Sequence, residues 1–390
     1  MIEEKFIETI EGITRLLVPL ESLTQRVPPK NPAFFNPLAK VNRNLSIMAY
    51  KAFLQDMNSD TTFADALCGV GARGLRVAVE VPGVRQIYLN DINPIAIDCA
   101  KKSADLNSII GLCNFSTEDT CKFLVEHSIR NGERFTMVDL DPFGSPSTYI
   151  DCLLRAVQDE GLISVTATDT AVLSGVHPEV CFRRYYGRPL NNQFSNETAV
   201  RILMSLIALT ASRLGLAIYP LFVHVNLNYI RIYAKIAASH SKANKVQQNI
   251  GYIQYCYKCG NRNTVREIGK SEVCNICGGS FKLSGQLWIE KLFDKEFIEK
   301  MSKYATNNYA SNRRNNLEHI LLRSCIDEID DIPYYFRSDE VASKLKKNSF
   351  PLLTIIDKLS TAGYRASKTS LNAGAFKTDA TIDQILKILD

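Results

Sequence analysis

Several features that would assign this chain of 390 residues to other protein classes are missing from it. Its first residues, MIEEKF, are acidic and contain no apolar core of a secretory signal, so we expect no export. The most apolar region, residues 202–225, is interrupted by Ser205, Thr210, Ser212 and Arg213, which favours a buried helix and strand over a membrane span. No internal repeat or low-complexity tract is present. We therefore expect a cytoplasmic protein with no membrane association.

Histidine is scarce, and cysteine does not follow the pattern of an exported protein. The five histidines are scattered, and none pairs with a plausible nucleophile. The 11 cysteines are an odd number in a chain without an export signal, which favours reduced thiols over a disulfide framework. Four of them form two close pairs. We expect the others to be thiols of the core, at positions 68, 99, 113, 121, 152, 181 and 325.

The composition is that of a soluble globular protein. Apolar residues make up 46% and charged residues 22%, which excludes a disordered chain. The length suggests two or three domains. The net charge of +5 is compatible with a polyanionic partner but does not by itself identify one.

Apolar runs alternate with helical patterns between residues 61 and 166, which predicts parallel βαβ units. We expect helices at 43–53, 74–81, 94–106 and 198–214, and strands at 62–67, 86–89, 113–116, 135–140, 162–166, 217–225 and 229–237. Sheets of this kind bind ligands at the carboxyl ends of their strands. The candidate functional turns all lie at such ends.

The first of these turns is DALCGVGARG at 65–74. Gly69 and Gly71 let the backbone approach a ligand and begin a helix whose N-terminus faces it. A tight turn without a ligand would also fit. Arg73 is unusual for a dinucleotide site and suits the carboxylate of a cofactor that carries an amino acid.

Two acidic residues end the next two expected strands. Asp91 follows the glycine turn at the spacing of an acid that binds ribose hydroxyls, a signal that also fits NAD or a helix cap. Asp119 stands where an acceptor for an adenine amine would lie, although a solvated loop acid fits equally.

The most specific turn is DLDPFGSP at 139–146. An aryl amine is a poor nucleophile because its lone pair is delocalised into the ring. Asp141 and the carbonyl of Pro142 can accept its two N–H bonds and stabilise the positive charge that forms on nitrogen, while Phe143 stacks on the base. A simple capping aspartate is the alternative. Together the turns indicate methyl transfer from S-adenosylmethionine to an exocyclic base nitrogen.

The paired cysteines form a separate motif. Cys256 and Cys259, then Cys274 and Cys277, are each followed directly by glycine, and fourteen residues separate the pairs. Four thiolates at this spacing predict a closed, structural zinc site, whereas a redox dithiol would not need two pairs.

Other clusters are less specific. Phe34 and Phe35 fit a packed N-terminal segment or a platform for base stacking. Mixed cations and aromatics at 183–188 and basic clusters at 344–347 and 365–368 read as solvated surface when each is taken alone. The order of elements from 336 to 379 resembles a winged helix.

With these motifs in hand, the chain resembles the tRNA (guanine-26-N2)-dimethyltransferase family of archaea and eukaryotes over nearly its whole length. The resemblance is carried by Glu11-Gly12, FFNP at 34–37 with Asn42-Arg43, the two turns above, NDINP at 90–94, Asn196-Glu197 with Arg201, YIRIY at 229–233, the cysteine pairs and Lys377-Thr378-Asp379. Asn228, Phe35 and Thr120 stand where the family often has His, Tyr and Ala.

The resemblance implies a class I S-adenosylmethionine-dependent methyltransferase domain with a Rossmann-like α/β fold at 1–240. It also implies a C-terminal α+β domain at 241–390 that binds tRNA and contains the zinc knuckle at 252–280. Asp141 would position and deprotonate the amine, with Phe34 and Phe143 flanking the base. The implied cofactor contacts are Arg43, Arg73, Asp91, Asp119 and Thr120, to which the first turn adds Asp65, Gly69 and Gly71.

Two other functions stay open from the residues alone. One is methylation of another guanine or adenine amine in tRNA or rRNA. The other is a silent RNA-binding protein that retains the fold and the zinc knuckle, which the intact Asp141 and Asp91 argue against. We expect S-adenosylmethionine, one structural Zn²⁺, tRNA as the partner and a monomer.

Overall fold

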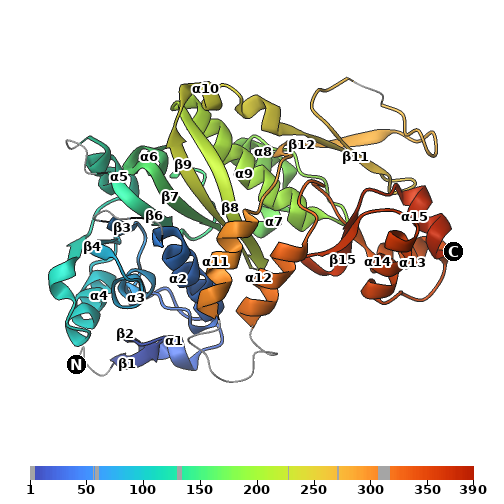
Figure 1. Cartoon of the computed structure of the whole chain (residues 1–390). Coiled ribbons are helices and arrows are strands. Elements are labelled where there is room, and N and C mark those ends of the chain that lie inside the picture. Colours follow the sequence, from blue (N-terminus) through green and yellow to red (C-terminus); the bar gives the residue numbers. More distant parts are fainter. Residues whose placement is uncertain are drawn as a thin grey trace. The chain divides into compact units, whose positions relative to one another are not determined.

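Seven strands form the central sheet, in the order β5-β4-β3-β6-β7-β9-β8 (Figure 1). The computed structural model describes residues 5–55, 57, 61–129, 134–226, 228–269, 272–305 and 317–390. The strands are β3 (Thr61–Asp65), β4 (Val84–Asn90), β5 (Cys113–Ser116), β6 (Phe135–Leu140), β7 (Val157–Ala167), β8 (Leu216–Asn226) and β9 (Tyr229–Ala238). All seven expected strands are present.

The strands β5, β4, β3, β6 and β7 pair in parallel, with helices between them. The helices are α2 (Lys40–Leu54), α3 (Ala72–Glu80), α4 (Pro94–Leu106), α5 (Thr120–Ile129) and α6 (Ile150–Ala156). Helices α3 and α4 lie on one side of the sheet and α5 and α6 on the other (Figure 1). Because β3 pairs with β4 on one side and β6 on the other, the order of the chain reverses at β3, where such sheets bind ligands.

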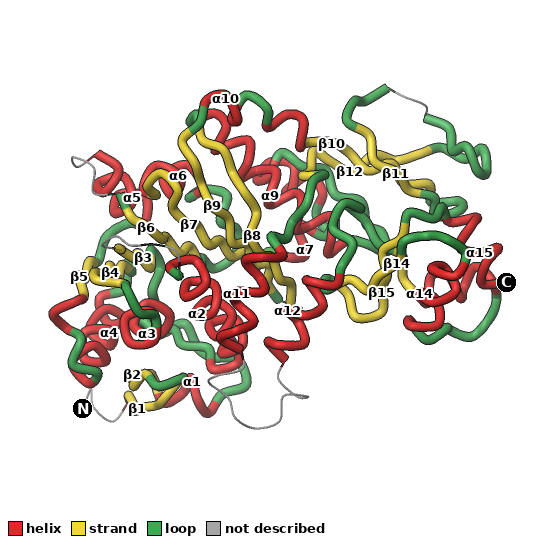
Figure 2. The backbone as a smooth tube through the Cα atoms, in the orientation of Figure 1, coloured by secondary structure: helices red, strands yellow, loops and turns green. Residues whose placement is uncertain are grey.

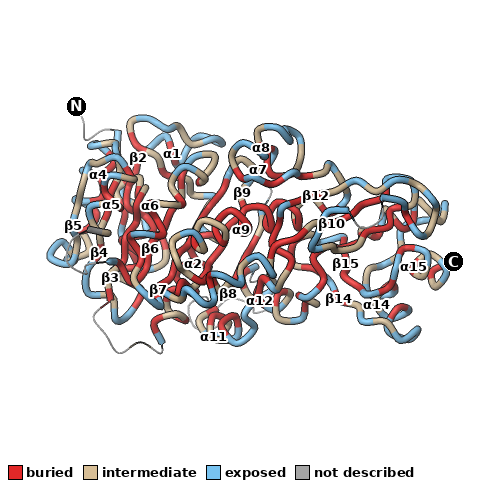
Figure 3. The backbone as a smooth tube through the Cα atoms, turned by 90° about the horizontal axis from the view of Figure 1, so that it is seen from above, coloured by how far each residue is buried: buried red, intermediate tan, exposed pale blue. Residues whose placement is uncertain are grey.

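The middle strands are buried on both faces, as a doubly covered sheet requires. Every residue of β6 is buried, and Figure 3 shows this part of the sheet as buried backbone. The parallel register places Asp65 opposite Asp139 at the carboxyl ends of β3 and β6. Two carboxyl groups therefore meet at this edge, which must contain a cation or protonate one of them.

The chain divides into two compact units. The first comprises residues 1–166, 233–238 and 296–322, and the second comprises 167–232, 239–295 and 323–390. The first unit also contains the hairpin of β1 (Phe6–Glu11) and β2 (Thr14–Pro19), which is a separate two-stranded sheet. Helix α1 (Leu20–Thr24) follows it. Helices α11 (Lys295–Ala305) and α12 (Leu317–Asp327) come late in the chain, and the sequence pattern did not predict them.

The second unit contains a long buried helix and a small sheet around the cysteine pairs (Figure 2). Its elements are α7 (Thr170–Leu173), α8 (Pro178–Tyr185), α9 (Ser195–Arg213), α10 (His240–Ala243), β10 (Ile250–Cys256), β11 (Arg262–Val265) and β12 (Phe281–Trp288). Short 3₁₀ helices in the two units cover Pro37–Ala39, Ile110–Leu112 and Val246–Asn249.

The last part of the second unit has the winged-helix order that the sequence suggested. Its elements are β13 (Phe336–Arg337), α13 (Ser338–Leu345), α14 (Leu352–Thr361), β14 (Ala366–Thr369), β15 (Asn372–Thr378) and α15 (Ile382–Leu389), with the three strands in one sheet. The helices and the hairpin enclose a core that includes Phe336, Ile355 and Phe376. A capping box at Thr381 begins α15, where both N-terminal bonds of the motif are made.

One expectation about the cysteines is wrong. A disulfide joins Cys121 in the first turn of α5 to Cys152 in α6, with 5.5 Å between the Cα atoms. The two positions are 31 residues apart, so only the packing of α5 against α6 brings them within bonding distance.

Among the helices that the structure describes, none is long and apolar enough to cross a membrane.

A buried ion cluster links distant parts of the second unit. The ammonium of Lys377 lies 2.9 Å from Oε1 of Glu197 and 2.9 Å from Oε1 of Glu328, and Arg201 also contacts Glu197. All four side chains are fully buried. Burial lowers the pKa of Lys377, but the charges of Glu197 and Glu328 outweigh it and raise that pKa above its ordinary value. The motifs at 196–201 and 377–379 thus form one structural site.

We expect Lys377→Met to destabilise the protein strongly, because it leaves two buried carboxylates with fewer cations. Removing one partner of a buried pair costs about 3–5 kcal/mol. The matched control is Lys368→Met, on the neighbouring strand β14, where the side chain is exposed. Denaturant unfolding measures both variants. Equal stability of the two would show that the cluster does not hold this unit together.

Candidate functional site

The turn after β3 is built around two glycines in the left-handed region. Gly69 has φ of 55° and Gly71 has φ of 78°. A Cβ at Gly69 would lie 3.1 Å from the carbonyl oxygen of Phe34, and one at Gly71 would lie 2.9 Å from Cβ of Ala100. The turn therefore brings the N-terminal segment close to the start of α3, whose backbone N–H groups can bind an anion.

Asn90 holds three turns together at the carboxyl edge of the sheet. Its buried amide donates to the carbonyls of Ala66 and Glu118, and its side-chain oxygen accepts from Ser116 and from the N–H of Glu118. These bonds connect the turns after β3, β4 and β5. The sequence motif contained Asn90, but its position beside Asp91 revealed nothing of this role.

The two acids expected near the cofactor have different local tasks. Asp91 accepts a hydrogen bond from the N–H of Gly69 at 2.8 Å, while the cap of α4 is Asn93. The helix-cap alternative for Asp91 is therefore excluded. One oxygen of Asp119 caps α5 by accepting from the N–H groups of Cys121 and Lys122, and Thr120 beside it is buried.

Arg43 is bound inside the first unit. Its guanidinium donates to both oxygens of Glu11, at 2.6 and 2.5 Å, and to the carbonyl of Asn36 at 2.9 Å. It also lies over the ring of Phe35. Burial raises the pKa of Glu11, but the hydrogen bonds and charge of Arg43 outweigh it and hold that pKa below its ordinary value. Arg43 thus fixes the segment 34–37, which carries Phe34.

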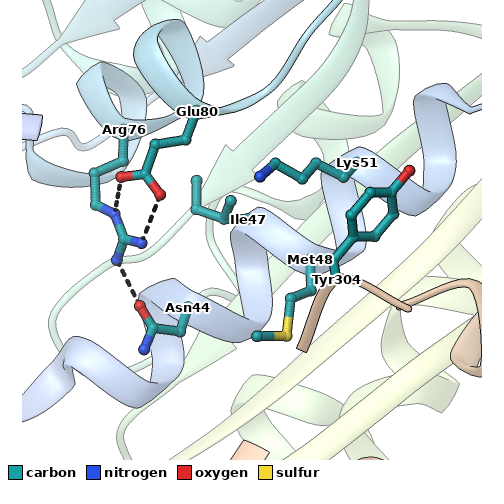
Figure 4. Close-up of a pocket in the computed structure, with 7 residues that line it drawn as sticks. All are labelled: Asn44, Ile47, Met48, Lys51, Arg76, Glu80 and Tyr304. Carbon is teal, nitrogen blue, oxygen red and sulfur yellow. Dashed lines mark hydrogen bonds and ion pairs between the residues drawn. The ribbon is translucent and has the colours of Figure 1, made fainter. Parts of the chain in front are cut away.

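Glu11 belongs to a wider network that Figure 4 shows in part. Arg76 binds Glu80, Asn44 and Glu11, and Lys51 lies near Glu80 (Figure 4). The cavity beside them has a volume of about 10 Å³, which is the space of one water molecule. This network therefore holds α2 and α3 together and leaves no room for a cofactor.

Arg73 lies between Asp139, near the end of β6, and Asp141, in the turn after it. Its Nη2 donates to Oδ2 of Asp141 at 2.5 Å, and its Nε lies 3.3 Å from Oδ1 of Asp139. Its Nη1 donates to Asn42 and Ser46 on α2. The guanidinium is 7% exposed, whereas the side chain of Asp141 is 30% exposed. The arginine is thus interior, and the aspartate faces outward.

The buried hydroxyl of Tyr50 contacts Asp139, and the sequence analysis did not single it out. Tyr50 on α2 donates from Oη to Oδ2 of Asp139, and Ser164 on β7 donates to the same oxygen at 3.0 Å. Tyr50 is fully buried. Its helical spacing from Arg43 and Ser46, seven and four residues away, places the three on one face of α2 and was the signal available in the sequence.

A third carboxyl group is close to the cluster. Asp65 accepts from the N–H of Gly74 and is fully buried. Burial and the negative charge of Asp139 raise the pKa of Asp65 to about 8. This change is in the direction that lessens the negative charge Arg73 has to balance.

The two expected base-stacking rings meet in the structure. Phe34 and Phe143 are in edge-to-face contact, with 4.8 Å between ring centroids, and the ammonium of Lys30 lies 4.5 Å from the Phe143 ring. Phe143 is 58% exposed, which is unusual for a large apolar side chain. An exposed ring beside Asp141 is suited to stack on a planar ligand.

The four cysteines form a compact cluster in the second unit. Their sulfur atoms all lie within 4.8 Å of one another. Two tight turns place them, because Gly260 and Gly278 have positive φ and donate to the carbonyls of Cys256 and Cys274. Four soft ligands at tetrahedral spacing fit zinc and offer no open position for catalysis.

A larger hollow in the second unit has different chemistry. It has a volume of about 950 Å³, and its charged lining residues are mostly acidic, including Glu290, Asp294 and Asp331. Arg365, which also lines it, pairs with Asp331 and Asp379. This hollow is unsuited to phosphate groups, and Arg365 is already bound to two carboxylates.

Comparisons with known proteins agree with the geometry. The family model for N2,N2-dimethylguanosine tRNA methyltransferase matches residues 12–390. A tRNA (guanine(26)-N(2))-dimethyltransferase of Methanothermobacter thermautotrophicus is 33% identical over 97% of both chains, and one of Methanocaldococcus jannaschii is 34% identical over 92% of this chain and 93% of its own. A relative in Aquifex aeolicus, 30% identical over 97% of this chain and 95% of its own, is named for both guanine 26 and guanine 27.

A solved structure agrees over almost the whole chain. Trm1 from Pyrococcus horikoshii, determined with S-adenosyl-L-methionine, superposes with a TM-score of 0.82 and 27% identity, covering 98% of this chain and 99% of its own. The fold is therefore that of a class I methyltransferase with an additional C-terminal region, as the sequence predicted. By sequence, structure and the arrangement of its turns, the chain belongs to the N2,N2-dimethylguanosine tRNA methyltransferase family.

Proposed function

We propose that this protein transfers one and then two methyl groups from S-adenosylmethionine to N2 of guanine 26 in tRNA. The observation that carries the proposal is the position of Asp141. It is partly exposed at the carboxyl end of β6 beside the exposed ring of Phe143, and Arg73 connects it to the glycine turn after β3. The side chain of Arg73 thus connects Asp141, which would bind the amine, to the glycine turn, which would bind the nucleoside cofactor.

The cofactor would lie over the turns after β3, β4 and β5. Gly69 and Gly71 shape the first turn, Asp91 would accept from the ribose hydroxyls, and Asp119 with Thr120 would bind the adenine. Asp91 accepts a hydrogen bond from the N–H of Gly69, so the ribose and the methionine part of the cofactor would bind to one connected surface. The proposed set of cofactor-binding residues is completed by Asp65 at the end of β3 and by Arg43 and Arg73 in the first turns of α2 and α3.

The guanine would stack on Phe143 and Phe34, with its amine toward Asp141. In the structure the two rings touch each other, so a base that enters between them exchanges one aromatic contact for two. Asp141 and the carbonyl of Pro142 would accept the two N–H bonds and stabilise charge on the nitrogen during transfer. Asp141 then takes the proton. A monomethylated amine keeps one N–H, so a second transfer can follow.

The two regions of the chain would divide the work. Residues 1–240 would bind the cofactor and the base, and residues 241–390 would bind the body of the tRNA. The cysteine cluster within 252–280 would hold one zinc ion that stabilises its two turns. Lys344, Lys346 and Lys347 are candidates for phosphate contacts, although Lys347 is paired with Asp390 in the structure. We propose a monomer that acts in the cytoplasm.

We expect Asp141→Ala to abolish methyl transfer while leaving the affinity for S-adenosylmethionine nearly unchanged. The lost acceptor acts mainly in the transition state, so the loss should be about 3 kcal/mol or more, on the order of 100-fold. Asp91→Ala should show the opposite pattern, with cofactor affinity lost first. Single-turnover rates and cofactor titration measure the two effects. Transfer within tenfold of the parent would contradict the role of Asp141.

The purified protein should contain one zinc ion per chain. Closed thiolate sites stabilise small modules that have little core of their own. We expect Cys256→Ser/Cys274→Ser to lose the metal and lower thermal stability, whereas Cys113→Ser, outside the cluster, should retain it. Metal analysis under reducing conditions decides the question. A stable double variant with full activity would show that the cluster is not a structural zinc site.

The substrate position can be tested with transcripts that carry guanine or adenine at position 26. To react, the base must leave its stack, at a cost of a few kcal/mol, and stacking on aromatic rings returns about 1–3 kcal/mol. We expect N2-methylguanine and N2,N2-dimethylguanine at position 26 only, as read by nucleoside mass spectrometry. Equal methylation of the adenine transcript would favour a different amine. Product at guanine 27 would instead indicate the wider specificity named for the Aquifex relative.

A further inference from the structure

We propose that Arg73 is a positioning residue for Asp141, and that Tyr50 and Asp139 hold Arg73 in that position. This inference rests on the proposed function, because it assigns an internal support to the residue that would receive the amine. It goes beyond that function by bringing in Tyr50, a buried side chain of α2.

The contacts form one continuous chain from the interior to the site. Tyr50 donates to Oδ2 of Asp139, Oδ1 of Asp139 faces Nε of Arg73, and Nη2 of Arg73 donates to Oδ2 of Asp141. The exposure rises along it, from fully buried Tyr50 and Asp139 to 7% for Arg73 and 30% for Asp141. The support is rigid and interior, and only the last carboxyl group reaches the surface.

Arg73 is fixed from more than one direction. Its Nη1 donates to Asn42 and Ser46, and Ser46 is hydrogen-bonded to Tyr233 on β9. A planar guanidinium that is held at Nη1 and Nε can present its third nitrogen, Nη2, in one orientation only. Because that nitrogen binds Oδ2 of Asp141, the second oxygen of this carboxyl group is left to point toward a ligand. A carboxyl group aligned in advance needs no reorganisation when the amine arrives.

In this arrangement Arg73 has two roles, because it aligns Asp141 in addition to binding the cofactor. If Arg73 served the cofactor carboxylate alone, the hydroxyl of Tyr50 would be irrelevant to the methyl-transfer step. If Arg73 aligns Asp141, removal of that hydroxyl must loosen Asp139, then Arg73 and then Asp141. The two roles therefore differ in which kinetic constant responds to a change at Tyr50.

The deciding variant is Tyr50→Phe, which keeps the ring in the core and removes only the hydroxyl. We expect the rate of methyl transfer at saturating substrates to fall at least fivefold, with the affinities for S-adenosylmethionine and tRNA within twofold of the parent. The rate should fall further in Tyr50→Phe/Ser164→Ala, which removes both hydroxyl donors to Oδ2 of Asp139. Arg73→Lys should also lower the rate, because an ammonium cannot reproduce the three-sided contact.

Thr14→Val is the matched control. Thr14 is a buried hydroxyl of the same unit that donates to a carboxylate, Glu80, which in turn binds Arg76. Like Tyr50, it is a buried hydroxyl that donates to a carboxylate, but Glu80 does not belong to the chain of contacts that joins Tyr50 to Asp141. We expect Thr14→Val to leave the transfer rate within twofold of the parent, and thermal unfolding of both variants measures any general loss of stability.

A double-variant cycle separates positioning from general structural damage. In an Asp141→Asn background, single-turnover transfer with enzyme in excess should be insensitive to Tyr50→Phe, because the support has no carboxylate to align. An equal loss in both backgrounds would overturn the proposal. So would an unchanged rate in Tyr50→Phe together with a weakened affinity for the cofactor. If the parent protein itself transfers no methyl group to guanine 26, the proposed function fails instead.

Discussion

The guanidinium of Arg73 is the contact on which the candidate site depends. It lies in the first turn of α3, directly after the glycine turn, and it binds aspartates at the end of the neighbouring strand β6. Since β3 and β6 are parallel and in register, their carboxyl ends bring several acids together, and one buried cation keeps Asp139 and Asp141 compatible. Burial and the negative charge of Asp139 raise the pKa of Asp65 to about 8, which lessens the negative charge at this edge. The ion pair with Arg73 thus holds the carboxyl group of Asp141 at this edge.

The same principle recurs in both units. Glu11 joins Arg43 and Arg76 in the first unit, and Lys377 joins Glu197 and Glu328 in the second. Buried charges of this kind add little net stability when they are paired, yet breaking one pair is costly. These buried ion pairs therefore connect specific segments that are far apart in the sequence. Glu11 and Glu197, which the sequence motifs contain, are both bound to buried cations of their own unit.

The second unit complements this site with a different kind of stabilisation. Its four-cysteine cluster holds two tight turns in a region with short strands, and the winged-helix part packs around its own apolar core. The large hollow of the unit is mostly acidic, so it is a poor surface for RNA.

The sequence alone determined the strands, the turns that follow them and the four-cysteine motif, because these are local. Alternation of apolar runs predicted all seven strands, and β5 and β6 have the predicted bounds. Gly69, Asp91 and Asp141 follow strands directly, so their position at one edge follows from parallel pairing. The cysteine spacing is likewise a local signal. The helix expected at 43–53, which is α2 in the structure, already placed Arg43 and Tyr50 on one face.

Only the tertiary structure decided which partner each charged residue has. Arg73 was expected to face a cofactor, and its contacts with Asp139 and Asp141 became visible only in the fold, where the first turn of α3 and the end of β6 lie at one edge of the sheet. The disulfide of Cys121 and Cys152 and the link from Lys377 to Glu197 join positions 31 and 180 residues apart. Sequence patterns record which side chains are apolar along one element, but a charge finds its partner by distance in space. For that reason the contacts that connect Tyr50, Asp139, Arg73 and Asp141 could be recognised only in the folded chain.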